Sequence, residues 1–294
     1  MRKVIGVITA RMRSTRLPGK VLAKVSGKSI FALVYERMRQ VEGLSGVYLA
    51  TSVDPLNKAL IKEAKALGCG WYAGAEQDIV ERHIELCERG KADAVIRVTC
   101  DCPLFDMAST SRFVNAFKKD YFDFIYISNA SMIQGIFSEL ISYEALREVH
   151  KHYRGAAISI YIRENLDKFK TLGLKIETDL TRPEYRLTVD ESQDLKLIRA
   201  IYAALYKGKP LDLHAVYAWL DDNPEVAELN RQVGIKGCNV RVAGLMERPV
   251  YSIVNSTNKY VILDAQKRVV KPQDFLAKLK VLFPSLKITP KRRS

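Results

Sequence analysis

Two kinds of segment alternate along the first hundred residues of the chain. Short apolar runs rich in β-branched residues predict buried strands, because parallel strands covered on both faces read as continuous apolar runs. Segments with apolar residues at helical spacing predict amphipathic helices. The predicted strands lie at 4–9, 46–50, around 71–72 and 94–98, and the predicted helices at 29–41, 55–67 and 78–89. This alternation is typical of βαβ units and predicts an α/β fold with an open, mostly parallel sheet flanked by helices.

The pattern becomes less regular after residue 120. Extended runs predict strands at 122–127, 137–141, 169–176 and 185–190, and helices are predicted at 143–153, 156–165 and 191–207, with two shorter ones to about 231. Gly234 to Cys238 indicates a boundary, which divides the chain into a main domain, 1–232, and a C-terminal appendage, 233–294. Extended runs at 250–254 and 260–263 and a helix after Pro272 predict a small α+β appendage.

The loop after the first predicted strand combines cations, hydroxyls and a turn. Its cations are Arg11, Arg13, Arg16 and Lys20, and Pro18-Gly19 marks a tight turn between them. In an open α/β sheet, ligands bind outside the carboxyl ends of the strands. Arg and Lys side chains neutralise phosphates there and loop N–H groups cradle them, so the loop predicts a polyphosphate site. A solvated basic surface is the alternative.

Two aspartates follow predicted strands at the same edge of the sheet. Asp101 comes after the run at 94–98, and Asp190 ends the run at 185–190. A nucleoside triphosphate needs Mg²⁺, which proteins hold with one or two carboxylates plus phosphate oxygens. Two such aspartates meet this need if the fold brings them together. Taken alone, each is more simply explained as a helix N-cap or a turn residue, where Asp is common.

The composition limits the class of protein. The 294 residues are 48% hydrophobic and 27% charged, as in ordinary globular domains, and can bury a sizeable core. No apolar run is long enough to span a bilayer, and the start shows no cleavable signal pattern. The five cysteines are an odd number without the spacing of a disulfide framework or a zinc site. We therefore expect a cytoplasmic protein without a membrane span.

The net charge is +14, and the segment 267–294, with nine Lys or Arg and one acid, contributes eight of these charges. A basic surplus suits nucleic acid, an anionic membrane surface or an anionic substrate such as a nucleoside triphosphate. The segment lacks the interleaved aromatic residues of single-strand binders, so nucleic acid is not the expected partner.

Three motifs carry a resemblance to a known family. They are Ala10-Arg11-x-x-Ser14-x-Arg16-Leu17-Pro18-Gly19-Lys20-x-Leu22, Asp-Cys-Pro-Leu at 101–104, and Arg-Leu-Thr-Val-Asp at 186–190 followed by Asp194-Leu195. Together they resemble the signature of sugar cytidylyltransferases, which make CMP-activated acidic sugars such as CMP-Kdo. The nearest branch is named after a spore-coat polysaccharide biosynthesis protein. The resemblance covers roughly residues 1–232.

The resemblance implies a Rossmann-like fold of the nucleotide-diphospho-sugar transferase type and a reaction of CTP with a sugar acceptor. It implies that Asp101 and Asp190 bind catalytic Mg²⁺ and that Arg11 and Lys20 share in catalysis. The implied nucleotide-binding residues are Ala10, Arg11, Ser14, Arg16, Lys20, Thr51, Ser52, Gly74, Asp78, Arg82 and Arg97. The implied acceptor-binding residues are Ser128, Asn129, Glu139 and Arg154. Members of the family often form homodimers.

The sequence departs from the family pattern mainly on the acceptor side. Cys100 replaces a usual Gly, Phe137 replaces the Asp of a Gly-Leu-Asp-Val-Glu run, and the Glu and His of an Arg-Glu-His-Val-Thr segment are absent from 154–159. The departures predict an unusual acceptor or altered transfer. A GT-A glycosyltransferase is one alternative, disfavoured because no Asp-x-Asp follows a predicted strand. A nucleotide-binding protein whose basic segment holds a partner or nucleic acid is another.

Overall fold

The computed structural model describes residues 2–128, 135–155, 158–176, 178–182 and 184–233, together with three short strands further along the chain. The chain forms two compact units, Met1–Val233 and Gly234–Ser294. In the second unit the described strands β10 (Ser252–Ser256), β11 (Lys259–Leu263) and β12 (Val269–Val270) form one antiparallel sheet. The helix expected after Pro272 lies outside the described residues.

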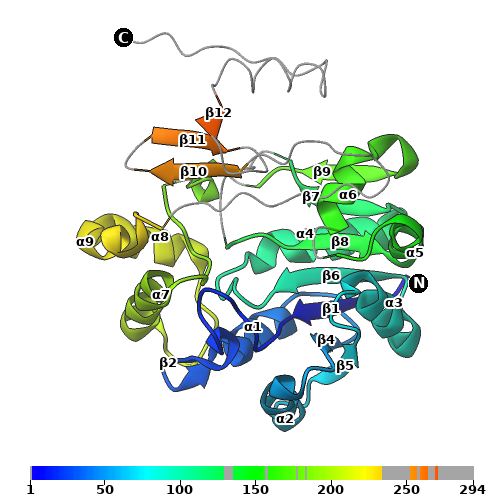
Figure 1. Ribbon diagram of the computed structural model, residues 1–294, viewed down its shortest axis with the longest axis horizontal. Coiled ribbons are helices and arrows are strands. Elements are labelled where there is room, and N and C mark those ends of the chain that lie inside the picture. Colours follow the sequence, from blue (N-terminus) through cyan, green and yellow to red (C-terminus); the bar gives the residue numbers. More distant parts are fainter. Residues whose placement is uncertain are drawn as a thin grey trace. The chain divides into compact units, whose positions relative to one another are not determined.

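The first unit is built on a seven-stranded sheet in the order β5-β4-β1-β6-β8-β7-β9 (Figure 1). The strands are β1 (Val4–Thr9), β4 (Val47–Ser52), β5 (Gly70–Gly74), β6 (Ala94–Thr99), β7 (Phe124–Ile127), β8 (Glu139–Ser142) and β9 (Thr171–Leu174). Only β8 runs antiparallel to its neighbours, β6 and β7. The predicted Rossmann-like, mostly parallel sheet is therefore confirmed.

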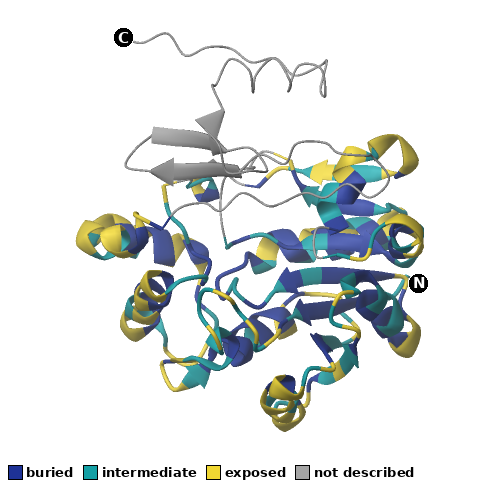
Figure 2. Cartoon of the chain, in the orientation of Figure 1, coloured by how far each residue is buried: buried dark blue, intermediate teal, exposed yellow. Residues whose placement is uncertain are grey.

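Helices cover both faces of this sheet, and two separate apolar clusters are buried between the helices and the strands. The central strand β1 is almost entirely buried (Figure 2). The helices are α1 (Ile30–Arg39), α2 (Lys58–Ala66), α3 (Ile79–Gly90), α4 (Met107–Lys119), α5 (Tyr143–His152), α6 (Ile158–Glu164), α7 (Ser192–Leu205), α8 (Leu213–Asp222) and α9 (Pro224–Ala227). Alternate residues of β1 point to opposite faces of the sheet. Val4 and Ile8 pack with α1, α2, α4, α7 and α8, whereas Ile5 and Val7 pack with α3, α5 and α6.

Several helices begin where the sequence places a short polar side chain. Ser29 accepts a hydrogen bond from the Ala32 amide at the start of α1, and Asp78 accepts one from the Glu81 amide at the start of α3. Such N-caps satisfy amide groups that have no partner inside the helix. The short 3₁₀ helix η1 (Lys20–Leu22) and the hairpin of β2 (Lys24–Val25) and β3 (Lys28–Ser29) lead from the first loop into α1.

The strand predicted at 185–190 is wrong. Arg186 makes a single bridge, and the following residues bond to the loop after β6 instead of joining the sheet. The Val189 amide donates to the Asp101 carbonyl at 2.8 Å, and the Thr188 hydroxyl donates to the same oxygen at 3.2 Å. Leu187 and Val189 are fully buried, which explains why the alternation reads as a strand. Apolar residues at alternate positions do not require a strand ladder, and here the hydrogen bonds of Thr188 and Val189 to Asp101 place Asp190 beside it.

Two further findings concern the described helices and cysteines. Among the described residues, none of the helices has the length and apolar character needed to cross a membrane. Cys69, Cys87, Cys100 and Cys102 are free thiols.

Candidate functional site

The loop that follows β1 folds back on itself at the carboxyl edge of the sheet. Its first residue, Ala10, is buried and donates its amide to the Ala50 carbonyl of β4. The Met12 amide donates to the Asn57 side chain, and the Met12 carbonyl accepts from the Gly19 amide at 3.0 Å. Gly19 has a φ of +71°, a backbone conformation that glycine adopts without strain. These contacts anchor the loop and return the chain to Lys20.

Lys20 lies at the point where the two predicted metal-binding aspartates meet. Its Nζ atom donates to Oδ2 of Asp101 at 3.0 Å, to Oδ1 of Asp190 at 3.0 Å and to the Val189 carbonyl at 2.7 Å. The Lys20 side chain is 11% exposed, so these groups form a nearly buried cluster. The structure therefore brings Lys20, Asp101 and Asp190 together although they lie far apart in the sequence.

The charges of this cluster fix its protonation. Burial by itself lowers the pKa of Lys20, but the charges of Asp101 and Asp190 outweigh it and hold that pKa above its usual value. Burial raises the pKa of Asp190, and Lys20, Arg16 and Arg186 together more than reverse this, so its pKa lies below the usual range. The Lys20 ammonium and the Asp190 carboxylate are therefore both charged at neutral pH, and Asp190 is presented in its metal-binding form.

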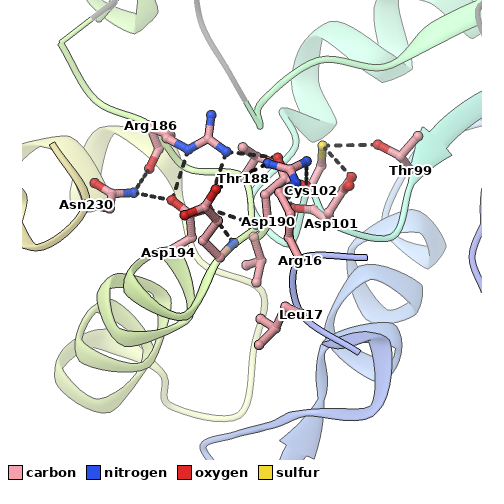
Figure 3. Close-up of polar contacts among 12 residues, drawn as sticks. Arg16, Leu17, Thr99, Asp101, Cys102, Arg186, Thr188, Asp190, Asp194 and Asn230 are labelled. Carbon is pink, nitrogen blue, oxygen red and sulfur yellow. Dashed lines mark hydrogen bonds and ion pairs between the residues drawn. The ribbon is translucent and has the colours of Figure 1, made fainter. Parts of the chain in front are cut away.

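Asp190 receives a different cation on each of its oxygens (Figure 3). Arg16 of the first loop lies 2.7 Å from Oδ1, the oxygen that also faces Lys20. Arg186 donates to Oδ2 at 2.8 Å and also contacts Asp194, which is fully buried. Arg186 begins the motif that ends in Asp190 and Asp194 follows it, but sequence reasoning gave neither residue a role. Their importance becomes visible only when the folded chain shows what they contact.

The other cations of the first loop are more exposed. Arg11 lies 3.8 Å from Glu76 with a side chain that is 54% exposed, and Arg13 pairs with Asp54. A long, exposed contact such as that between Arg11 and Glu76 contributes little to stability. The Ser14 hydroxyl accepts from the Leu17 amide within the loop. Arg11 is therefore accessible to an anionic ligand at the edge of the sheet.

Predicted nucleotide residues lie at the ends of the neighbouring strands β4 and β5. Thr51 and Ser52 are buried at the end of β4, where Ser52 accepts a hydrogen bond from Asn57. The Thr51 hydroxyl is a buried polar atom without a hydrogen-bond partner among the described residues. The carbonyl of Gly74, at the end of β5, accepts from the Val53 amide. The carboxyl edge therefore continues from the first loop across β4 and β5.

Asp78 and Arg82, on the first turn of α3, have different roles. Asp78 accepts from His150 at 2.8 Å and lies 3.1 Å from Nε of Arg154. Arg82 is buried and donates to the carbonyls of Ala75 and Glu76, both at 2.6 Å from Nη2. Arg82 thus fixes the loop before α3 and has no exposed group to offer a nucleotide directly.

The predicted acceptor residues do not form one cluster in the described part of the chain. Glu139, at the start of β8, pairs with Arg97 of β6 at 3.0 Å across neighbouring strands. Arg154 lies beside Asp78, on the nucleotide side. Ser128 follows β7 and bonds to the Leu174 carbonyl. Asn129 lies outside the described residues. The described acceptor residues thus have different partners: Glu139 pairs with Arg97, Arg154 pairs with Asp78, and Ser128 bonds to Leu174.

The departures from the family pattern lie near this region. Cys100 is buried, and burial raises the pKa of its thiol well above the usual value. Phe137 packs against the larger apolar cluster. Neither side chain offers a charged group to an acceptor at neutral pH.

The donors available to a metal ion are few. Within the described residues there is no group of three or more His, Cys, Asp or Glu side chains placed to hold a metal. Asp101 and Asp190 are two hard oxygen donors that already share one cation, the Lys20 ammonium. This arrangement fits a magnesium ion that takes its remaining ligands from phosphate oxygens and water.

Comparison with known proteins gives a consistent picture. A family model described as "Cytidylyltransferase" matches residues 5–217. An uncharacterized protein of Methanocaldococcus jannaschii is 31% identical over 238 residues, which cover 79% of this chain and 96% of that protein. The spore coat polysaccharide biosynthesis protein SpsF of Bacillus subtilis is 26% identical, with 77% of this chain and 98% of that protein covered. A solved cytidylyltransferase structure from Leptospira borgpetersenii has a TM-score of 0.72 at 24% identity and covers 78% of this chain and 98% of its own.

Proposed function

Because the chain belongs to the cytidylyltransferase family and is a nucleotidyltransferase, we propose that it transfers a cytidylyl group from CTP to an acidic sugar. Pyrophosphate is the second product. One observation carries the proposal: Asp101 and Asp190 converge on Lys20 at the carboxyl edge of β1 and β6, directly beside the cationic loop. The similarity to a spore coat polysaccharide biosynthesis protein supports a role in surface polysaccharide synthesis.

The proposal assigns Mg²⁺ to Asp101 and Asp190. Their carboxylates are the hard oxygen ligands that Mg²⁺ prefers, and their shared contact with one ammonium supports their ability to share one cation. When bound, Mg²⁺ would neutralise the triphosphate and stabilise the charge that develops on the departing pyrophosphate.

The chain's own groups would position the reactants. A sugar hydroxyl attacks the α-phosphorus of CTP in line and releases its proton to solvent, the bond from this phosphorus to the bridging oxygen breaks, and the electron pair leaves with pyrophosphate. Arg11, Arg16 and Lys20 would bind the phosphates, since they surround the carboxyl edge of β1. Catalysis of this kind depends on positioning and charge neutralisation rather than on a covalent intermediate.

The strand ends next to the loop are proposed to hold the nucleoside. The buried Thr51 hydroxyl without a described partner supports a ligand contact at the end of β4. Ser52, Gly74 and Asp78 line the same edge. Arg97 is the proposed link between the nucleotide and acceptor sides, because it lies in β6 just before the loop of Asp101.

The acceptor is proposed to bind over β6, β7 and β8, with contacts from Ser128, Asn129 and Glu139, and to reach Arg154 at the border with the nucleotide side, beside Asp78. Arg97 and Arg154 would offer cations to an acidic sugar after rearrangement of their ion pairs with Glu139 and Asp78. The proposal also includes a cytoplasmic location, which rests on composition, and a homodimer, which rests on the family resemblance.

The test is pyrophosphate release with Mg²⁺ and each of the four ribonucleoside triphosphates, against a panel of acidic and neutral sugars. We expect release that requires CTP and one class of acidic sugar. The variants Asp101→Ala and Asp190→Ala should lose this release. Asp106→Asn is the matched control, because Asp106 is also largely buried but caps α4 away from the cluster.

Full CTP-dependent release in both alanine variants would overturn the assignment of the two aspartates. Failure of every triphosphate to bind would overturn the proposal as a whole. Tight CTP binding without pyrophosphate release for any sugar would indicate that the altered acceptor side, at Phe137 and 155–158, prevents transfer to these sugars.

A further inference from the structure

A buried carboxylate lies behind Asp190, on the side away from Lys20. Asp194 is 0% exposed and lies in the first turn of α7. Its oxygens accept hydrogen bonds from Nε of Arg186 at 2.9 Å, from the amides of Asp190 and Glu191 at 2.9 and 3.0 Å, and from Asn230 at 2.9 Å. A buried charge is tolerated only when it is fully paired in this way. Because all of these donors bind the Asp194 carboxylate, its orientation is fixed.

Arg186 connects Asp194 to Asp190. Its Nη2 atom lies 3.3 Å from Oδ2 of Asp194 and 2.8 Å from Oδ2 of Asp190, so one planar guanidinium contacts both carboxylates (Figure 3). The Arg186 side chain is 12% exposed. The nitrogen atoms of a guanidinium lie in one plane at fixed separations, so Arg186 fixes the position of the Asp190 carboxylate relative to that of Asp194.

Asn230 completes the arrangement from a distant part of the chain. It is 3% exposed and lies in the short 3₁₀ helix η5 (Glu228–Asn230). Its Nδ2 atom donates to Oδ1 of Asp194 at 2.9 Å and to the Arg186 carbonyl at 2.8 Å. Asn230 therefore holds both members of the pair that supports Asp190, yet it makes no described contact with Asp190 itself.

We propose that Asp194 and Asn230 are positioning residues that, through Arg186, hold the Asp190 carboxylate in the orientation that binds the divalent cation. The backbone of Asp190 is fixed by its amide bond to Asp194, and Oδ2 of Asp190 is fixed by Arg186. Oδ1 is thereby directed toward Lys20 and Asp101, the position assigned to the metal. Partners behind metal ligands commonly control metal affinity in this way. The inference rests on the metal assignment made under the proposed function.

The experiment measures binding of Mn²⁺ in the presence of CTP by electron paramagnetic resonance, which requires no turnover and no knowledge of the acceptor. The variants are Asp194→Asn and Asn230→Ala, with Asn223→Ala as the matched control. Asn223 also donates its side-chain amide to a backbone carbonyl, that of Trp219 at 2.7 Å, in the helices that precede Asn230. Thermal unfolding is recorded for every variant.

We expect Asp194→Asn to weaken Mn²⁺ binding about tenfold or more, the range found for residues behind metal ligands, and Asn230→Ala to weaken it in the same direction. Asn223→Ala should bind Mn²⁺ as the wild type does, even where its melting temperature falls. If Asp194→Asn does not fold, Asn230→Ala decides the question alone, since it removes only two hydrogen bonds.

If folded Asn230→Ala and Asp194→Asn bound Mn²⁺ with wild-type affinity, the inference would be overturned. The assignment of the metal to Asp101 and Asp190 would be unaffected. Absence of Mn²⁺ binding by the wild-type protein with CTP would instead overturn the metal assignment, and this inference with it.

Discussion

The Nζ atom of Lys20 lies 3.0 Å from Oδ1 of Asp190, in the position where a metal ion shared by Asp190 and Asp101 would lie. The ammonium therefore neutralises the two carboxylates. Binding of CTP with Mg²⁺ would supply both a replacement cation for the carboxylates and new anionic partners for Lys20. With the metal ion proposed above, the lysine and the metal would compete for the same two carboxylates.

This competition predicts the effect of Lys20→Met. Nucleotide-free Lys20→Met should bind Mn²⁺ about tenfold more tightly than wild type, a difference of about 1.4 kcal/mol, because no ammonium occupies the site. Its CTP-dependent pyrophosphate release should be lost, because the triphosphate loses a cation. Lys24→Met is the control, since Lys24 is exposed in β2. Weaker Mn²⁺ binding by Lys20→Met would show that the lysine does not compete with the metal.

Gly135 packs against the segment that carries Asp190. Its φ is +96°, and an added Cβ would lie 2.4 Å from the backbone carbonyl carbon of Leu187 and the backbone nitrogen of Thr188. Gly135→Ala should therefore lower the free energy of unfolding by more than about 2 kcal/mol and also weaken CTP-dependent Mn²⁺ binding, because the backbone before Asp190 must shift.

Gly208→Ala separates backbone strain from this displacement. Gly208 has a φ of +79° but no atom within 4 Å of an added Cβ. The variant should lose only about 1 kcal/mol and bind Mn²⁺ normally. Chemical denaturation and Mn²⁺ titration measure both effects, and equal losses in the two variants would contradict the role given to the Gly135 contact.

His83 makes the stability depend on pH. It is fully buried, and this burial, together with the charge of Arg97, lowers its pKa to about 3. Its Nδ1 lies 2.7 Å from the Ile79 carbonyl, which can only accept, so Nδ1 carries the proton and Nε2 faces the Thr9 hydroxyl. The histidine is therefore neutral in the folded protein at pH values where an unfolded histidine, with a pKa near 6.5, takes up a proton.

The unfolded state then binds more protons than the folded state between about pH 6.5 and 3. The contribution of His83 to stability is complete above pH 6.5 and is lost as the pH falls through this window, by up to about 1.4 kcal/mol per pH unit. His83→Gln should remove that slope. Denaturant unfolding at pH 7.5, 6 and 5 measures it, and parallel pH curves for wild type and variant would refute the assignment.

Arg37 is a structural cation at the centre of the first unit. It is 1% exposed and donates to the Phe105 carbonyl at 3.0 and 2.8 Å and to the Leu211 carbonyl at 2.5 Å. Arg37→Met should destabilise the protein by about 3 kcal/mol, because two buried carbonyls lose their donors. Arg39→Met, on the same helix but exposed, should change the free energy of unfolding by less than about 0.5 kcal/mol. A similar loss of unfolding free energy in both variants would show that the buried hydrogen bonds of Arg37 do not stabilise the protein.

The sequence by itself determined the layered α/β architecture. Periodicity is a local property, and each apolar run or amphipathic segment from β1 to β6 shows which face it buries without reference to the rest of the chain. The cationic loop before Lys20 and the acids Asp101 and Asp190 were visible for the same reason, because each follows its own apolar run. Caps such as Ser29 and Asp78 are also local, since they bond to amides three residues away.

The tertiary structure decided what each of these groups contacts. The run at 185–190 has the alternation of a strand, but its backbone partner is the Asp101 loop, and no local pattern contains that partner. Arg154 shares a motif with acceptor residues, yet it lies beside Asp78. Asn230 has no motif at all and becomes significant only through Asp194. Hydrogen bonds and ion pairs between distant segments depend on the position of the whole chain in space, and this non-local geometry turns two separate aspartates into one cation site.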